Sequence, residues 1–415
     1  MDIENLPVAI LAGGLATRLK PLTERIPKAL VEVAGRPFVD WQLEALAAQG
    51  VERVVFCVGH LGEMVEAHVG NGRRFGLGVS YSHDGPVLLG TGGALKQALP
   101  LLGGEFLVLY GDSFLRVDFG AVARRFRECG KPGLMTVMEN AGRWDASNVL
   151  MEGGRLVRYD KAARLPSMRH IDYGLEAFRE EVFAGRGDGA FDLAEVMGDL
   201  VESGEMEAME VRERFYEIGS AQGIADMENW LAGRPKRPAV FFDRDGVINE
   251  VVMRGGVACS PRMAADFRFK EGIQGLFAAV KSRGWLRIIA TNQPDVERGQ
   301  IPMAEYAAMR RMVFRELRPD GFEACEASSN DNPRKKPNPG MLLDAAAKHA
   351  VDLGRSWFVG DTWKDMEAGR RAGVRTILLE TDYNSEARTM ADFCFPTLAA
   401  IESFLLSQIP EASRT

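Results

Sequence analysis

Two aspartates follow an apolar run near the middle of the chain. Asp243 and Asp245 come directly after Ala239-Val240-Phe241-Phe242. If that run is an extended strand, both carboxylates point the same way. Two like charges held so close are costly unless a cation lies between them or one takes a proton. A solvated turn is the alternative, but the preceding run is too apolar for an ordinary surface loop, so the pair indicates chemistry.

Three downstream segments carry further polar and charged groups. Thr291 and Asn292 end an apolar run with hydroxyl and amide donors, and Lys336 is a cation flanked by prolines. Asp361 and Asp365 are four residues apart, which places them on one face if the segment is helical.

A glycine-rich loop near the N-terminus suggests a second kind of chemistry. The apolar run Val8–Leu11 leads within two residues into the pair Gly13-Gly14. Adjacent glycines let backbone N–H groups approach an anion closely. Arg18 adds a bidentate phosphate donor, and Lys28 offers a second cation. Taken alone, such a loop fits equally well as a tight turn between a strand and a helix.

The elements that must position these groups follow an α/β pattern, because short apolar runs alternate with longer amphipathic stretches. Runs predicted as strands are Val8–Leu11, Val54–Val58, Phe106–Tyr110, Leu134–Met138, Ala239–Phe242, Leu286–Ala290, Trp357–Val359 and Arg375–Leu379. Stretches predicted as helices are Phe38–Gln49, Phe119–Glu128, Ile273–Arg283 and Ala304–Arg318. The pattern predicts mostly parallel sheets covered on both faces.

A break separates two cycles of this pattern. The segment Gly233-Arg234-Pro235-Lys236-Arg237-Pro238 has two prolines and three basic residues in six positions, which disfavour a continuous helix or strand. We therefore expect a domain over residues 1–232, a linker over 233–238 and a second domain over 239–405.

The first domain resembles the sugar-1-phosphate nucleotidyltransferase family. The motifs occur in the family's order and approximate spacing. Beside the glycine loop they are Pro27-Lys28-Ala29-Leu30, Gly35-Arg36-Pro37, Gly90-Thr91-Gly92-Gly93-Ala94-Leu95, Gly111-Asp112, Asn148-Val149, Tyr159-Asp160-Lys161, Asp172-Tyr173-Gly174-Leu175 and Glu217-Ile218-Gly219. The resemblance implies a doubly wound, Rossmann-like fold. It also implies in-line attack of a sugar 1-phosphate on a nucleoside triphosphate, with release of pyrophosphate.

The same resemblance implies roles for individual residues. Nucleotide contacts fall on Leu11, Ala12, Gly13, Gly14, Gly92 and Gly93, with Arg18 and Lys28 as catalytic cations and Asn148, Lys161 and Asp172 facing the sugar phosphate. Asp112 becomes a Mg²⁺ ligand, with a helix N-cap as its alternative role. Where the family usually has a second aspartate ligand, this chain has Glu217, one methylene longer. Either the site adjusts, or Glu217 does not touch the metal.

The second domain resembles phosphatases of the haloacid dehalogenase superfamily, closest to the branch of heptose-bisphosphate and histidinol-phosphate phosphatases. The shared wording is Asp243-Arg244-Asp245-Gly246-Val247-Ile248-Asn249, Thr291-Asn292-Gln293 and Lys336-Pro337-Asn338-Pro339-Gly340-Met341, with Gly360-Asp361 downstream. The resemblance implies a Rossmannoid fold, Asp243 as nucleophile and Asp245 as acid and base. It places the phosphoryl group on Thr291, Asn292 and Lys336, and Mg²⁺ on Asp243, Asp245, Asp361 and Asp365. Asp365 has an orienting role as its alternative.

One departure concerns zinc. The branch commonly carries a Cys/His zinc loop before the lysine segment, whereas residues 325–334 here contain Cys325 and no histidine. One such ligand cannot build a four-coordinate site. We expect Mg²⁺ in both domains and no zinc.

Bulk properties exclude other classes. A net charge of −7 disfavours a nucleic-acid partner. The five cysteines are scattered and odd in number, which is typical of a reducing compartment. No apolar run is long enough for a membrane span, and the first residues are acidic, unlike a secretory signal. We expect a cytoplasmic protein with no membrane partner. The sequence leaves open whether the protein forms a homo-oligomer.

Fusion of the two activities suggests consecutive steps. The leading hypothesis is removal of a phosphate from D-glycero-D-manno-heptose 1,7-bisphosphate, followed by nucleotidyl transfer, from GTP in the first instance, to the sugar 1-phosphate. This inference rests on resemblance and adjacency. Another phosphorylated sugar or polyol, a histidinol-phosphatase-like second half, any other base, and a binding or regulatory protein with one inactive half are the alternatives.

Overall fold

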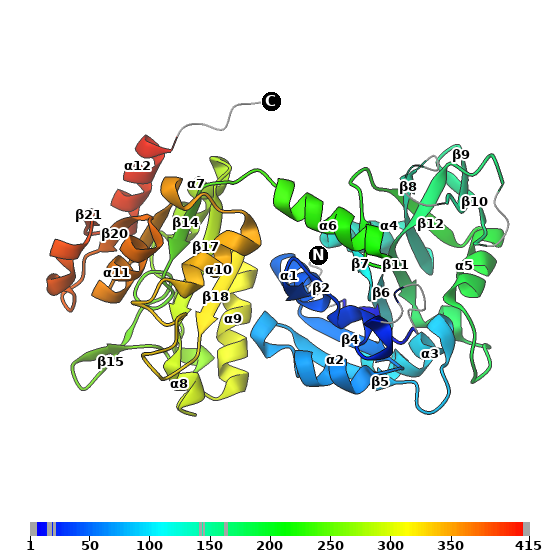
Figure 1. The fold of residues 1–415 in the computed structure, drawn as a ribbon, viewed down its shortest axis with the longest axis horizontal. Coiled ribbons are helices and arrows are strands. Elements are labelled where there is room, and N and C mark those ends of the chain that lie inside the picture. Colours follow the sequence, from blue (N-terminus) through cyan, green and yellow to red (C-terminus); the bar gives the residue numbers. More distant parts are fainter. Residues whose placement is uncertain are drawn as a thin grey trace. The chain divides into compact units, whose positions relative to one another are not determined.

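The structure is a computed structural model that describes residues 6–14, 19, 22–140, 143, 146–161 and 165–409. It divides into two compact units, Met1–Gly233 and Arg234–Thr415 (Figure 1). Each unit has its own sheet and its own hydrophobic core.

Unit 1 is built from helices and strands that alternate along the chain. Its α-helices are α1 (Phe38–Ala48), α2 (Gly62–Val69), α3 (Gly90–Leu102), α4 (Phe119–Cys129), α5 (Leu193–Glu202) and α6 (Ala221–Gly233). Its strands are β1 (Val8–Leu11), β2 (Glu32–Val33), β3 (Arg36–Pro37), β4 (Arg53–Val58), β5 (Gly78–His83), β6 (Glu105–Tyr110), β7 (Ser113–Phe114), β8 (Gly133–Glu139), β9 (Val149–Glu152), β10 (Arg155–Tyr159), β11 (His170–Arg179), β12 (Met206–Glu210) and β13 (Tyr216–Glu217).

The main sheet of unit 1 has a parallel half and an extension that runs the other way. In the order β5-β4-β1-β6, every neighbouring pair is parallel. Chain order reverses between β1 and β6, so the carboxyl ends of these two strands form the crevice where α/β sheets bind ligands. β11 then pairs antiparallel with β6, and β8 and β9 pair antiparallel with β11.

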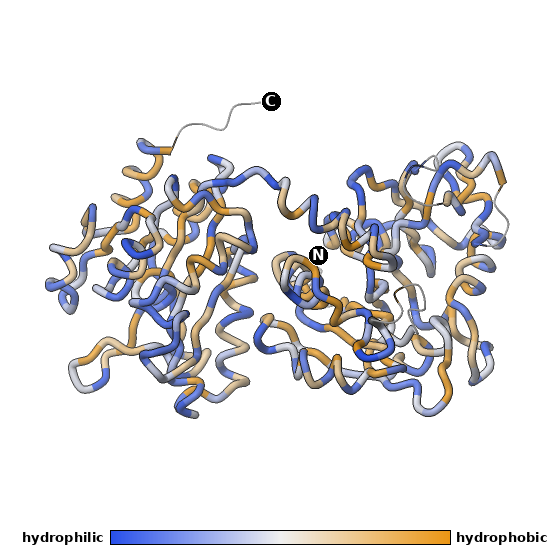
Figure 2. The backbone as a smooth tube through the Cα atoms, viewed as in Figure 1, coloured by the Kyte–Doolittle hydropathy of each residue, from blue (hydrophilic) through white to orange (hydrophobic). Residues whose placement is uncertain are grey.

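Alternating side chains bury both faces of this sheet. Val8 and Ile10 of β1 pack into one cluster with α1, α2 and α4, whereas Ala9 packs into another with α3 and α5. A strand buried on both sides reads as a continuous apolar run, which is why Val8–Leu11 was recognisable in the sequence. Figure 2 shows apolar and polar stretches interleaved along the backbone of both units.

Unit 2 repeats the alternation. Its α-helices are α7 (Ile273–Ser282), α8 (Pro294–Glu297), α9 (Met303–Leu317), α10 (Gly340–His349), α11 (Trp363–Ala372) and α12 (Leu398–Gln408). Its strands are β14 (Ala239–Phe242), β15 (Val252–Arg254), β16 (Val257–Cys259), β17 (Leu286–Asn292), β18 (Gly321–Cys325), β19 (Trp357–Gly360), β20 (Arg375–Leu379) and β21 (Phe393–Phe395).

The main sheet of unit 2 is wholly parallel, in the order β18-β17-β14-β19-β20-β21. Counted in chain order this is 3-2-1-4-5-6, the doubly wound arrangement, with its switch point between β14 and β19. Residues of α7, α9 and α12 cover one face, and residues of α10 and α11 cover the other. The antiparallel hairpin of β15 and β16 lies outside this sheet (Figure 1).

The predicted fold class is confirmed in both units, and every predicted strand and helix is present to within two residues at each end. The prediction of mostly parallel sheets holds for unit 2. In unit 1 the antiparallel strands β8, β9, β10 and β11 add a second half that the sequence did not indicate. No helix in the described part of the chain has the length and apolar character needed to cross a bilayer.

Candidate active sites

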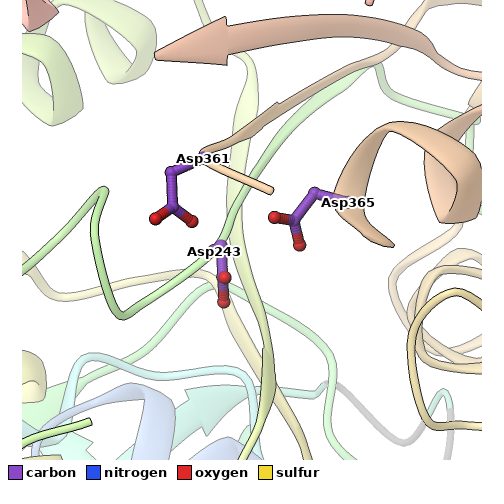
Figure 3. Close-up of side chains that lie close together, drawn as sticks. All are labelled: Asp243, Asp361 and Asp365. Carbon is purple, nitrogen blue, oxygen red and sulfur yellow. The ribbon is translucent and has the colours of Figure 1, made fainter. Parts of the chain in front are cut away.

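The three carboxylates of unit 2 converge at the switch point of its sheet. Asp243 follows β14, Asp361 follows the neighbouring strand β19, and Asp365 lies in the first turn of α11. One carboxylate oxygen from each lies within 4.8 Å of the others, and all three residues are buried. Figure 3 shows the three side chains directed toward a shared space. Their strands were predicted, and the topology explains why their ends meet.

This grouping is electrostatically unfavourable without a cation. Burial raises the pKa of Asp243 to about 7, against the opposing effect of Lys336 and with a further increase from Asp365. Burial and the nearby Asp243 and Asp365 carboxylates raise the pKa of Asp361 well above its ordinary value. Asp361 Oδ1 is buried and accepts no hydrogen bond. Three buried carboxylates this close together, one of them with an oxygen that has no hydrogen-bond partner, fit a hard divalent cation such as Mg²⁺.

Lys336 is the cation that the chain itself supplies. Its Nζ lies 2.8 Å from Asp243 Oδ1 and 2.6 Å from Asp365 Oδ1, and it donates to the carbonyl of Ala290 at 2.9 Å. Although burial lowers a lysine's pKa, the two carboxylates outweigh burial and raise the pKa of Lys336. Asp365 also accepts hydrogen bonds from the backbone and side chain of Thr362. Its carboxylate therefore orients both Lys336 and the start of α11.

Asp245 does not belong to the cluster of three carboxylates, and its own carboxylate is hydrogen-bonded to other side chains. Its oxygens accept hydrogen bonds from Arg244, Asn249, Ser260 and Gln293, at 2.6 to 3.2 Å. Burial raises its pKa, but Arg244 and the hydrogen bonds outweigh burial and lower it, so the resting carboxylate is ionised. The group whose oxygens converge contains Asp243, Asp361 and Asp365 without Asp245.

The predicted phosphate-binding residues lie beside Lys336. Asn292 donates to the carbonyl of Lys336 at 3.0 Å and accepts from its N–H at 3.0 Å, so its amide fixes the lysine segment. Thr291 is buried, and its hydroxyl accepts a hydrogen bond from Gln293 at 2.9 Å. Asn292 lines the pocket described next, whereas Thr291 is not among the residues that line it.

A pocket of about 590 Å³ opens above these residues, lined by Asp243, Asp245, Lys336 and Asp361 and bordered by the β15–β16 hairpin. Three cations, Arg298, Lys335 and Lys364, also line it. Burial and the charges of Arg298 and Lys364 lower the pKa of Lys335. The charge on Lys335 is thus disfavoured in this setting, and an anion placed beside it would stabilise that charge.

In unit 1 a smaller pocket lies at the crevice between β1 and β6. It has a volume of about 260 Å³ and is lined by Leu11, Ala12, Gly13, Gly14, Lys28, Ala29, Cys57, Asp84, Leu88, Gly90, Thr91, Ala94, Tyr110, Gly111 and Asp112. Six of the predicted residues, Leu11, Ala12, Gly13, Gly14, Lys28 and Asp112, are thus brought to one place. Lys28 forms an ion pair with Asp112 across 84 residues of sequence.

Glu217 lies next to Asp112 through a short antiparallel pairing. β13 pairs with β7 so that Glu217 stands opposite Ser113, and the N–H of Ile218 donates to the carbonyl of Asp112 at 2.9 Å. The main chains of the two acidic residues predicted to hold Mg²⁺ in this unit are therefore adjacent.

Glycine is required at positions 92 and 93 for a physical reason other than the expected room for a base or ribose. A Cβ at Gly92 would lie 2.3 Å from the ring of Phe191, and one at Gly93 would lie 2.5 Å from the carbonyl of Gly189. Both residues are buried, and their N–H groups face the carbonyl of Phe191 at 3.0 and 3.3 Å. The space beside them is filled by protein. Gly90 and Thr91, which directly precede them, line the pocket instead.

The predicted sugar-phosphate residues lie together around two tyrosines. Asn148 Oδ1 accepts from the N–H of Asp172 at 2.9 Å, and Asp172 Oδ2 accepts from Tyr159 at 3.1 Å. Lys161 Nζ lies 5.5 Å from the ring centre of Tyr110 and 6.0 Å from that of Tyr159. Because Tyr110 also lines the pocket that contains Asp112, the two predicted subsites are adjacent.

Arg18 lies outside the described residues, so its role stays a prediction. The structure adds side chains that the sequence did not single out: Gln293, Ser260 and Asn249 around Asp245, Asp84 in the pocket of unit 1, and Tyr383, which donates to Asp361 at 2.7 Å. Glu176 is another, fully buried close to Asp172 and Lys161. Asn249 and Gln293 each end a motif quoted in the sequence analysis and could have been found there. Ser260, Asp84, Tyr383 and Glu176 lie in none of those motifs.

Comparisons with known proteins agree with this division. A nucleotidyl transferase family model matches residues 8–145, and a HAD-hydrolase-like family model matches residues 333–401. N-acetylmuramate alpha-1-phosphate uridylyltransferase of Caulobacter vibrioides is 32% identical over 54% of this chain and 96% of its own length. The mannose-1-phosphate guanylyltransferase catalytic subunit beta of Xenopus tropicalis is 30% identical over 59% of this chain and 70% of its own length. The D-glycero-beta-D-manno-heptose-1,7-bisphosphate 7-phosphatase of Helicobacter pylori is 34% identical over 34% of this chain and 82% of its own length.

Proposed function

Because this chain belongs to the nucleotidyl transferase family in its N-terminal part and to the HAD-like hydrolases in its C-terminal part, we propose that it performs two consecutive steps of nucleotide-sugar synthesis. Unit 2 removes one phosphate from a sugar bisphosphate, with D-glycero-D-manno-heptose 1,7-bisphosphate as the leading candidate. Unit 1 then joins the remaining sugar 1-phosphate to a nucleotidyl group from GTP and releases pyrophosphate.

The convergence of Asp243, Asp361, Asp365 and Lys336 is the observation that carries the phosphatase step. Asp243 attacks phosphorus, so that a bond forms to its carboxylate oxygen as the bond to the sugar oxygen breaks. Lys336 stabilises the charge on the phosphoryl oxygens. Asp243, Asp361 and Asp365 would hold Mg²⁺, which supplies further charge neutralisation when bound.

Asp245 is placed to handle the proton in this reaction. It must donate a proton to the leaving sugar oxygen and later take one from the attacking water. Because its resting carboxylate is ionised and fully hydrogen-bonded, it must first change partners to take up that proton. Ser260, which follows the β15–β16 hairpin, is one of those partners. Movement of this hairpin with substrate would therefore change the state of Asp245.

A second phosphate on the substrate is favoured by the three cations of the unit 2 pocket. Arg298, Lys335 and Lys364 line the pocket that contains the reacting carboxylates. A substrate with one phosphate at Asp243 and another among these cations satisfies both groups. This arrangement favours a sugar bisphosphate over a monophosphate such as histidinol phosphate.

In unit 1, Lys28 and the glycine loop would bind the triphosphate, with Mg²⁺ on Asp112 and Glu217. Asp84 supports guanine as the base. Its carboxylate lies in a mostly apolar pocket, where burial raises its pKa against the effect of the Leu89 N–H. Guanine offers two adjacent donors, N1–H and N2–H₂, to such an acceptor. UTP is the alternative, because three relatives are named as uridylyltransferases.

The test uses the purified full chain with Mg²⁺ and the heptose 1,7-bisphosphate, with GTP, ATP, CTP, UTP and dTTP in parallel. Phosphate release followed by one nucleoside-diphosphate heptose, identified by mass spectrometry, is the expected result. Asp243→Asn should abolish phosphate release from the bisphosphate but keep pyrophosphate release when the sugar 1-phosphate itself is supplied. Asp112→Asn should abolish pyrophosphate release and leave phosphate release intact. Phosphate release from generic substrates with no heptose product would exclude the heptose and retain the phosphatase class.

A further inference from the structure

The two carboxylate oxygens of Asp361 have different surroundings. Oδ2 accepts a hydrogen bond from the hydroxyl of Tyr383 at 2.7 Å. Oδ1 is buried and has no hydrogen-bond partner. Asp361 belongs to the group whose carboxylate oxygens lie within 4.8 Å of one another. One oxygen is therefore fixed by the protein, and the other is left to a ligand.

The residue after Tyr383 holds the main chain of Asp361. The Nδ2 atom of Asn384 donates to the carbonyl of Asp361 and to that of Leu379, each at 2.8 Å. Leu379 ends β20, the strand beside β19, from which Asp361 emerges. Two consecutive residues thus bind Asp361: Tyr383 donates to its side chain, and Asn384 donates to its main-chain carbonyl. The loop after β20 sets the position of this aspartate.

The space for the contact between Tyr383 and Asp361 is left by a glycine. Gly246 has a φ of +92°, and a Cβ built on it would lie 2.0 Å from Asp361 Oδ2 and 2.8 Å from the Tyr383 hydroxyl. Any side chain at this position would displace one partner of the hydrogen bond. Gly246 follows directly after Asp245, so the loop after β14 is shaped around the same contact.

We propose that Tyr383 is a positioning residue for the cation site of unit 2. By fixing Oδ2, its hydroxyl turns Oδ1 of Asp361 toward the space shared with Asp243 and Asp365. This inference rests on the proposed phosphatase function of that unit. A carboxylate that loses such a partner can rotate away from the cation. Loss of an outer hydrogen bond to a metal ligand typically weakens metal binding about 10- to 100-fold.

The test measures Mg²⁺ binding directly, by calorimetric titration of the full chain without nucleotide. Subtracting the signal of Asp361→Asn isolates the site of unit 2. Tyr383→Phe, which removes only the hydroxyl, should bind Mg²⁺ about tenfold more weakly than wild type. At saturating Mg²⁺ its phosphatase kcat should return to within about threefold of wild type, because the reacting groups are intact.

A matched control removes a different hydroxyl from the same unit. Tyr306 is buried, its hydroxyl has no hydrogen-bond partner, and it does not line the pocket. Tyr306→Phe should leave Mg²⁺ affinity unchanged. Equal Mg²⁺ affinity in Tyr383→Phe and wild type, with binding lost in Asp361→Asn, would overturn the positioning role and leave the phosphatase function standing. If wild type neither binds Mg²⁺ at this site nor releases phosphate, both fail.

Discussion

Lys336 Nζ lies 2.8 Å from Oδ1 of Asp243, the residue proposed as the nucleophile. The same ammonium lies 2.6 Å from Asp365 and is buried with both carboxylates. A lysine in this place has two physical effects. It neutralises part of a buried cluster of negative charge, and it lies beside the atom at which a phosphoryl group would be transferred.

Replacing Lys336 with methionine separates these two effects. Phosphatase activity should fall about 100-fold or more, because charge stabilisation at the reacting phosphate is lost. The variant should also be less stable without Mg²⁺ by about 3–5 kcal/mol, since the carboxylates lose their buried partner. Mg²⁺ should therefore raise the melting temperature of the variant more than that of wild type, measured by calorimetry. An unchanged nucleotidyltransferase rate is the control, and wild-type phosphate release from Lys336→Met would contradict this role.

The positions of Asp243 and Asp361 could be predicted because each follows a short apolar run that forms a central strand. Parallel strands that are buried on both faces leave a clear signal in the sequence, and their carboxyl ends meet at the switch point. The pairing of Lys28 with Asp112 had no such signal, because 84 residues separate them. Spacing in the sequence does not reveal which loops return to the same edge of a sheet.

Gly92 and Gly93 illustrate a different limit. A glycine is required equally where a ligand approaches the backbone and where another part of the chain does so. The sequence cannot distinguish the two, and here Phe191 and Gly189 occupy the space. Tyr383 shows a third limit, since it lies in a loop with no periodic pattern and acts on an aspartate 22 residues away. Similarly, no apolar alternation marks Glu176 as part of the buried sheet.

Lys335 should determine whether unit 2 prefers a bisphosphate. Its ammonium lines the pocket with Arg298 and Lys364, where a second phosphate would lie. Lys335→Met should raise the KM for the heptose 1,7-bisphosphate about tenfold, as expected for the loss of a charge-assisted contact. The KM for a generic monophosphate should stay unchanged. Lys281→Met, at an exposed position of α7, is the matched control. Equal effects on both substrates would show that Lys335 does not discriminate between them.

Asp84 should govern the choice of base in unit 1. Asp84→Asn replaces one of the two carboxylate acceptors with a donor, which opposes the two donors of guanine. The kcat/KM for GTP should fall about tenfold or more, while that for UTP changes little. The five triphosphates are compared at fixed sugar 1-phosphate, and phosphate release by unit 2 serves as the folding control. A parallel loss with every triphosphate would assign Asp84 to the structure of its loop rather than to the base.

Glu176 should make the stability of unit 1 depend on pH. Burial, together with the nearby Asp172 carboxylate, raises its pKa well above the ordinary value of 4.5. Between the two values the folded chain keeps a proton that the unfolded chain has lost. The contribution of Glu176 is therefore most favourable below pH 4.5 and declines as pH rises toward the folded-state pKa, at a slope of up to about 1.4 kcal/mol per pH unit.

Glu176→Gln removes this decline, because an amide keeps the shape of the neutral carboxyl and does not titrate. Denaturant midpoints of the two proteins should agree near pH 4.5, and the variant should be the more stable one at pH 8. Glu180→Gln, at an exposed position beyond the end of β11, should follow wild type at both pH values. If Glu176→Gln also follows wild type at pH 8, the carboxyl of Glu176 is ionised in the folded chain, and the charge of the nearby Lys161 outweighs burial.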